Sequence, residues 1–227
     1  RADALLTAYG SRLISASDWI DRALAQRLTD EVTITFDDGL REAYVVALPV
    51  LEARGLTAAW YPYTGPLVGV PNNLERWRWL RNHGYGSVEA FYAALWTAQR
   101  PISTPPDYLA GYGYLSAEDR AYRYWRDITR PAEYEQIMGE LERACGTRFD
   151  PAARWMDRYD LGQLARRGHV IGWHTHSHPP DIRALSVEQQ VLEYATSAWI
   201  VGSSWFGTRG VLTMSHPRGF ASPEGLA

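Results

Sequence analysis

Apolar residues alternate with threonines along residues 32–36, and this period of two predicts a strand with a buried face. In residues 41–54 the apolar positions recur every three or four residues instead, which predicts a helix that ends at Gly55. Pro49 is expected to kink or shorten this helix. A second strand is predicted at residues 57–61. Strand, helix and strand at this spacing favour a parallel sheet with ligands at the carboxyl ends of its strands.

The α/β pattern stops after residue 62 and resumes at about residue 154. Between these points the apolar spacing is helical, so we expect a mostly helical insertion at about 64–154. The predicted organisation is an N-terminal helical segment at 1–30 and an α/β domain at 31–227 that the insertion interrupts. The remaining expected elements are helices at 17–28 (capped by Ser17), 74–81, 88–98, 117–126, 132–144, 159–167 and 187–201 (capped by Ser186), and strands at 169–173 and 211–214.

Composition narrows the class of protein. The chain has 227 residues, of which 46% are apolar, so it can bury a full core. Its net charge of -3 gives no electrostatic case for binding nucleic acid or an anionic membrane. No apolar stretch predicts a membrane span or a signal peptide, and the single Cys145 excludes an internal disulfide. A soluble protein is expected, either cytoplasmic or exported with its leader removed, and the oligomeric state stays open.

Polar residues that suit a metal-dependent hydrolase follow three of the predicted strands. Asp37 and Asp38 come after the first strand, and two adjacent carboxylates are costly unless a cation or a shared proton relieves them. Histidines at 174, 176 and 178 follow another strand, and a polar turn at 215–219 follows a third. Because the carboxyl ends of parallel strands meet on one rim, these segments are expected to converge. The alternative for the acid pair alone is a solvated turn.

Three motifs carry a resemblance to a known family. They are Thr35-Phe36-Asp37-Asp38-Gly39, His174-Thr175-His176-Ser177-His178 and Pro217-Arg218-Gly219. In order and spacing they resemble the first three motifs of the NodB-homology polysaccharide deacetylases, also called carbohydrate esterase family four. The resemblance covers about residues 31–63 and 155 to the end. An insertion that follows Thr64-Gly65-Pro66-Leu67 is similar to that of bacterial surface-glycan or capsule-locus members.

The resemblance implies a distorted (β/α)-barrel and a divalent metal, usually zinc, with Co²⁺, Ni²⁺ or Mn²⁺ as substitutes. Carried over by position, Asp38, His174 and His178 are the metal ligands and Asp37 is the general base. The backbone N–H of Arg218 stabilises the oxyanion. In an extended segment His176 points away from the ligands, so we expect a structural role for it. Residues expected to contact the substrate are Pro217, Tyr63 and Trp173.

Two departures from the family pattern affect the expected chemistry. Ser215 stands where many members carry an Arg beside the general base, so the tuning of Asp37 stays open. The late Leu-x-His motif that supplies the general acid would lie beyond Ala227, and the C-terminal strands are either missing or not included. His216 is the candidate replacement acid, with a structural role as the alternative.

The resulting prediction is an enzyme that removes an N-acetyl or N-formyl group from an amino sugar of a bacterial polysaccharide or surface-glycan precursor. One alternative is a catalytically silent domain of the same fold that binds a glycan or acts as a scaffold. Another is a hydrolase for a non-sugar amide.

Overall fold

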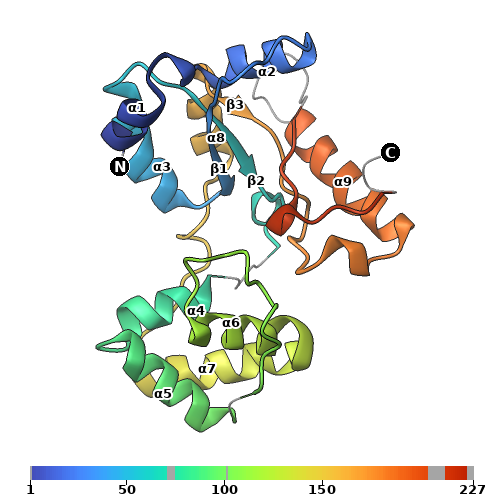
Figure 1. Ribbon diagram of the computed structural model, residues 1–227. Helices are drawn as coiled ribbons and strands as arrows, with labels where there is room; N and C mark the ends of the chain where they lie inside the picture. The colour runs from blue at the N-terminus through green and yellow to red at the C-terminus, as the bar shows by residue number, and fades with distance from the viewer. Residues whose placement is uncertain (1, 71–74, 101, 204–212, 224–227) are drawn as a thin grey trace. The chain divides into compact units, whose positions relative to one another are not determined.

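The chain folds into two compact units in a computed structural model that describes residues 2–70, 75–100, 102–203 and 213–223. The first unit combines Arg1–Pro71 with Ala152–Ala227, and the second is Asn72–Pro151 (Figure 1). Within the described residues, no helix has both the length and the hydropathy that crossing a membrane requires.

A small parallel sheet organises the first unit. Its strands are β1 (Ile34–Asp38), β2 (Ala58–Pro62) and β3 (Val170–Ile171), in the order β1-β2-β3. Helix α3 (Arg41–Glu52) connects β1 to β2, so the predicted strand-helix-strand unit and its parallel pairing are confirmed. The register places Asp38 opposite Pro62, which fixes the end of β1 beside the end of β2.

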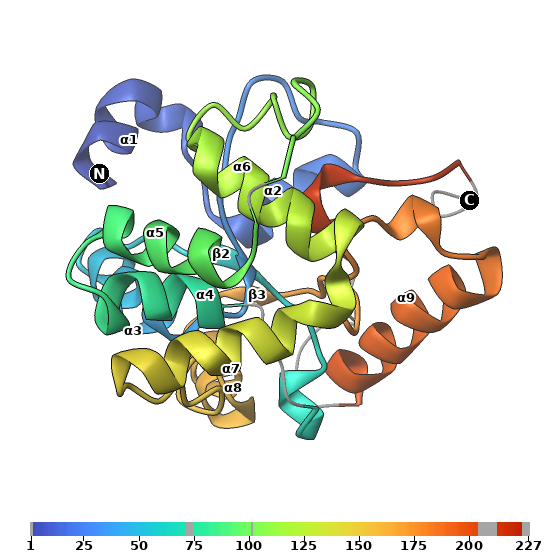
Figure 2. The same ribbon diagram turned by 90° about the horizontal axis from the view of Figure 1, so that it is seen from below.

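Helices surround this sheet. Figures 1 and 2 show α3 and α9 on opposite sides of the strands. The hydrophobic core beside the sheet contains aromatic side chains. Trp60 of β2 is fully buried and stacks on Phe36 of β1, with ring centroids 4.2 Å apart. Burying one such side chain contributes about 1.5–3 kcal/mol to stability. The other helices of this unit are α1 (Ala2–Tyr9), α2 (Ala16–Leu24), α8 (Arg158–Arg166) and α9 (Val187–Gly202).

The second unit is helical, as the apolar spacing predicts. Helices α4 and α6 are each continued by a π-helical turn, at Leu80–Gly84 and Trp125–Thr129. The core is rich in aromatic side chains, among which Tyr122 and Trp125 are fully buried. The helices are α4 (Arg76–Trp79), α5 (Val88–Ala98), α6 (Ala117–Tyr124) and α7 (Tyr134–Cys145).

Helix α2 begins and ends earlier than predicted. Helix α2 spans Ala16–Leu24 instead of 17–28, and its cap is Ser15, whose hydroxyl accepts from the backbone N–H of Asp18 at 3.1 Å. Ser15 and Ser17 both suit an N-cap. The helix begins after Ser15, and its buried residues are Ala16 and Ile20. The positive φ of Gln26 ends the helical path before residue 28.

Several other boundaries also differ. Strand β1 starts and ends two residues later than expected. Its pairing with β2 begins at Ile34 and continues through both aspartates. Helix α3 passes through Pro49 and ends at Glu52. The strand expected at 169–173 is reduced to Val170–Ile171, and Trp173 instead forms a bridge to Met214. Residues 74, 211 and 212 of the expected elements lie outside the described residues, and so does the chain after Pro223.

Candidate metal centre

The two aspartates end β1 at a tight turn in which position 39 favours glycine. Asp38 has a left-handed φ of 69° and Gly39 one of 80°. A Cβ on Gly39 would lie 2.8 Å from the Cβ of Pro62, so a larger residue would push β1 away from β2. The backbone N–H of Met156 donates to the carbonyl of Gly39 at 2.8 Å and holds the turn from the other side.

The end of β2 also positions His174. Its backbone N–H donates to the carbonyl of Pro62 at 3.1 Å, so His174 and Asp38 flank the same residue from the two neighbouring segments. Gly172 permits this close pairing, because a Cβ there would lie 2.5 Å from the ring of Tyr61 and closer still to the carbonyl oxygen of Thr213. The rim expected from the sequence is therefore formed by tight backbone packing.

Three side chains converge at this rim. The Oδ1 atom of Asp38 lies 3.5 Å from Nε2 of His174 and 3.3 Å from Nε2 of His178. Candidate ligand atoms of all three residues lie within 4.8 Å of one another. Tetrahedral zinc with bonds of about 2.05 Å separates its ligand atoms by about 3.3 Å, so the spacing suits a small divalent cation.

The tautomer of His174 also suits a cation. Its Nδ1 lies 2.7 Å from the carbonyl oxygen of Ser215, and because a carbonyl only accepts, Nδ1–H must be the donor. In the neutral ring Nε2 then carries a lone pair that faces the oxygen of Asp38. Two lone pairs that face each other need a metal ion or a proton between them. The donor set therefore fits a bound metal.

The electrostatics of these residues show a site that favours positive charge, whether it is carried by a proton or by a cation. Burial alone would raise the pKa of Asp38, but the hydrogen bonds and charges of His174 and His178 hold that pKa well below its usual value. Burial alone would lower the pKa of His174, but Asp38 raises it overall, with help from Asp37. The side chains of His174 and His178 are only 3% and 9% exposed, so water screens these charges weakly.

Asp37 lies beside this group and is more exposed than Asp38. Its Oδ2 accepts a hydrogen bond from the hydroxyl of Ser215 at 3.1 Å. Partial removal from water raises the pKa of the Asp37 carboxyl, while His174 and the Ser215 hydroxyl oppose that rise. Ser215, which stands where the resemblance places an arginine, therefore contacts the candidate base through a neutral donor.

The other expected site residues have different surroundings. The ring of Tyr63 lies 5.5 Å from that of His178 and 4.9 Å from that of Trp155, so it borders the three candidate ligands. Trp173 packs against the hydrophobic core beside the sheet. Pro217 is buried, and Arg218 adopts a left-handed φ of 58° in the same turn.

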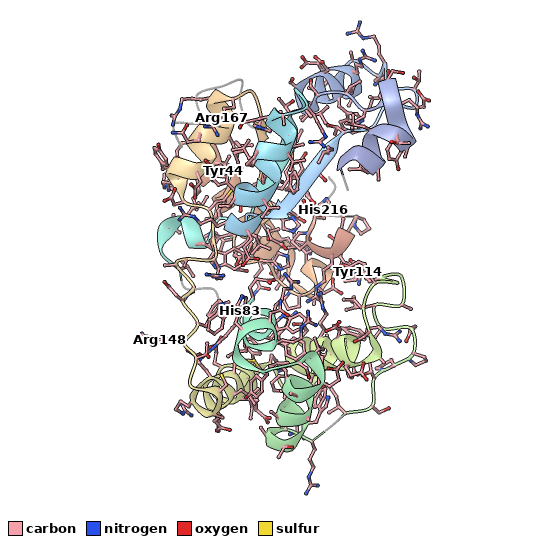
Figure 3. All side chains as sticks on the ribbon, turned by 90° about the vertical axis from the view of Figure 1, so that its left-hand side faces the viewer. Tyr44, His83, Tyr114, Arg148, Arg167 and His216 are labelled. Atoms are coloured by element: carbon pink, nitrogen blue, oxygen red, sulfur yellow. The ribbon has the colours of Figure 1, made fainter. Side chains whose placement is uncertain are left out.

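His216, labelled in Figure 3, shares a hydrogen bond of 3.1 Å between its Nδ1 and the hydroxyl of Tyr194 on α9. Burial lowers the pKa of His216, and the neighbouring His174 lowers it further. His216 is thus neutral near pH 7 and would have to gain a proton before it can donate one.

Sequence reasoning missed the partners that hold these residues. Thr64 contacts His176, with 3.0 Å between Oγ1 and Nδ1, and Glu193 contacts the backbone of the same loop. Glu193 comes from a helix without a motif, and Thr64 from a stretch noted only for the insertion that follows it, so only the fold reveals these contacts.

Comparison with known proteins identifies the fold. No protein-family model matches the chain, and no curated protein matches it in sequence. The deacetylase PplD of Streptococcus pyogenes, solved in complex with acetate, is similar with a TM-score of 0.50 and 14% identity over 94% of this chain and 58% of that one. The deacetylase domain of BpsB from Bordetella bronchiseptica is similar with a TM-score of 0.54 and 13% identity, over 99% of this chain and 70% of that one. The chain thus spans little more than half the length of PplD and shares the fold of both deacetylases.

Proposed function

We propose that this chain is a metal-dependent deacetylase that hydrolyses an N-acetyl, or alternatively an N-formyl, amide on an amino sugar of a bacterial polysaccharide or surface-glycan precursor. The observation that carries the proposal is the convergence of Asp38, His174 and His178 beside Asp37. Its setting in a fold shared with two deacetylases supports the reaction type. The same likeness supports a sheet that belongs to a distorted (β/α)-barrel of the NodB-homology type.

Asp38, His174 and His178 would hold the metal, with zinc as the first candidate and Co²⁺, Ni²⁺ or Mn²⁺ as substitutes. A bound divalent cation polarises an amide carbonyl and makes water more acidic. The hydrogen bond from His174 to the carbonyl of Ser215 keeps its Nε2 lone pair directed at the site. Neutral imidazoles suit zinc and the other borderline metals better than they suit Mg²⁺ or Ca²⁺.

Asp37 would act as the general base that takes the proton of the attacking water. The Ser215 hydroxyl donates to its Oδ2 and orients the carboxylate. When water adds to the amide carbonyl, the backbone N–H of Arg218 would stabilise the oxyanion. As the C–N bond breaks, the leaving amine needs a proton, for which His216 is the candidate donor within the described residues.

The three expected substrate contacts Tyr63, Pro217 and Trp173 differ in how accessible their side chains are. Tyr63 and Trp155 are only 1% and 5% exposed, so their rings would support His178 and shape the site instead of stacking on a sugar. Pro217 is buried as well, whereas Trp173 is only partly buried and is the most accessible of the three to a substrate.

The test is acetate release from an N-acetylated amino-sugar oligomer, measured with the zinc-loaded chain and together with binding of the same oligomer. We expect turnover that a chelator abolishes and that added zinc restores. Binding without any acetate release, even with zinc, would overturn the proposed enzyme in favour of a silent glycan-binding domain. Release of acetate only from a non-sugar amide would overturn the substrate class.

A further inference from the structure

The loop that carries both histidines has an unfavourable backbone. Thr175 and His178 adopt left-handed φ values of 65° and 56°, a region that residues with a Cβ avoid and that β-branched threonine avoids most. This path brings the two imidazole rings to a centroid distance of 5.0 Å. An extended strand would place residues four apart at about 13 Å, so the ligand geometry depends on keeping the strained path.

The segment after β2 holds one side of the loop. The backbone N–H groups of Thr64 and Gly65 donate to the carbonyls of Thr175 and His176, at 3.1 and 2.9 Å. These bonds satisfy two carbonyl groups of the loop. The N–H groups of the same loop need other acceptors.

Glu193 of α9 supplies those partners. Its Oε2 accepts from the backbone N–H groups of His176 and Ser177, both at 2.8 Å. Its Oε1 accepts from the hydroxyl of Ser177 at 2.6 Å. One carboxylate therefore binds two successive backbone N–H groups and a side chain between the two candidate ligands.

Helix α9 is itself well fixed where it meets this loop. Ser186 and Gln189 form a reciprocal capping box at its start. Further along, the buried hydroxyl of Ser197 shares a hydrogen bond of 3.1 Å with Thr64, so α9 is tied to the segment that holds the other side of the loop. The carboxylate of Glu193 thus extends from a rigid element.

We propose that Glu193 is a positioning residue that holds the histidine loop in its metal-binding conformation. The inference rests on the proposed metal-dependent function, because it concerns the same site. Glu193 acts through geometry: its carboxylate must reach the loop, while its negative charge contributes less. Partners that orient metal ligands in this way typically change metal affinity by about 10–100-fold when they are removed.

Three variants of the full chain separate the effect of the length of the Glu193 side chain from the effect of its charge. Glu193→Asp keeps the charge but withdraws the carboxylate by one methylene group. Glu193→Gln keeps the reach and loses the charge, and its amide can still accept from the backbone and donate to the Ser177 hydroxyl. Glu188→Gln is the matched control on the same helix, since the Glu188 carboxylate accepts from the Ser186 hydroxyl at 2.8 Å at the capped start of the helix.

The measurement is the dissociation constant for Zn²⁺ by competition with a chromophoric chelator, together with the visible spectrum of the Co²⁺-substituted protein. We expect Glu193→Asp to bind Zn²⁺ about tenfold more weakly or worse, with an altered Co²⁺ spectrum. Glu193→Gln and Glu188→Gln should stay within about threefold of the original chain. Thermal unfolding of the metal-free variants shows whether each one is folded.

Each outcome decides the inference. Original affinity and spectrum in a folded Glu193→Asp variant would overturn it, and so would a loss confined to Glu193→Gln, which would assign the effect to charge. A drop in metal-free stability with unchanged affinity would show a purely structural role. Failure of the original chain to bind Zn²⁺ would instead refute the proposed function, so the two failures are distinguishable.

Discussion

His169 gives the first unit a specific sensitivity to acid. Its Nδ1 accepts two hydrogen bonds, from the backbone N–H of Ala58 at 2.9 Å and from the indole N–H of Trp60 at 3.2 Å. The ring must therefore be neutral, with its proton on Nε2. A proton on Nδ1 would face two donors inside the core, where the residue is only 5% exposed.

The pKa of His169 is accordingly lowered from the ordinary value of 6.5, chiefly by burial. The charge of Arg167 lowers the pKa further, whereas the charge of Glu52 opposes this. Because the pKa is lower in the folded than in the unfolded chain, the unfolded chain binds more protons below about pH 6.5. The contribution of His169 to stability is therefore complete above that pH and is lost as the pH falls.

One proton limits the size of this effect to about 1.4 kcal/mol per pH unit. Other groups titrate nearby: the lowered pKa of His216 acts in the same direction, and the raised pKa of His174 acts in the opposite one. The effect of His169 must therefore be taken as a difference between variants. In His169→Asn the side-chain oxygen can replace Nδ1 as the acceptor, without a group that titrates.

The assay is the urea midpoint for unfolding between pH 5 and pH 8. We expect His169→Asn to be less stable at pH 8 by about 1–3 kcal/mol, because the smaller side chain leaves a cavity beside Trp60. Its stability should decline less between pH 7 and pH 5 than that of the original chain. The exposed His83 provides the control variant His83→Asn. If His169→Asn lost stability with acid as steeply as the original chain, this reasoning would be refuted.

Three further predictions follow from the site. Asp37→Asn should retain the metal and lose about 10²–10⁴-fold in turnover, measured as acetate release, and full activity would exclude Asp37 as the base. His178→Ala should lose the metal at zinc concentrations that saturate the original chain, as metal analysis after dialysis would show. Gly172→Ala should destabilise the first unit by about 1–3 kcal/mol through its clash with Tyr61. The matched control Gly202→Ala, where a Cβ meets nothing within 4 Å, should change stability by less than about 0.5 kcal/mol.

The sequence is sufficient to predict the sheet and the convergence of its polar ends. Alternating apolar residues before Asp37 and a helical stripe after Gly39 specify β1, α3 and β2, because period and spacing are local properties. Parallel pairing then brings Asp38 and the histidines to one rim, which needs no knowledge of side-chain contacts.

The features that fix the site depend on distant segments and are not visible in the sequence. The left-handed backbone of Asp38 and His178 is uncommon for residues with a Cβ, and the local sequence does not predict it. The bond from Ser215 to Asp37 joins residues 178 positions apart. Glu193 occurs in an ordinary amphipathic helix, where a glutamate is expected to face solvent.

Metal content tests the central claim most directly. The chain is purified, supplied with zinc and dialysed, and its zinc is measured beside that of His174→Ala and Asp38→Ala. The account predicts about one zinc per chain, lost in both variants. A folded original chain that retains no zinc, or variants that retain as much as the original, would contradict it.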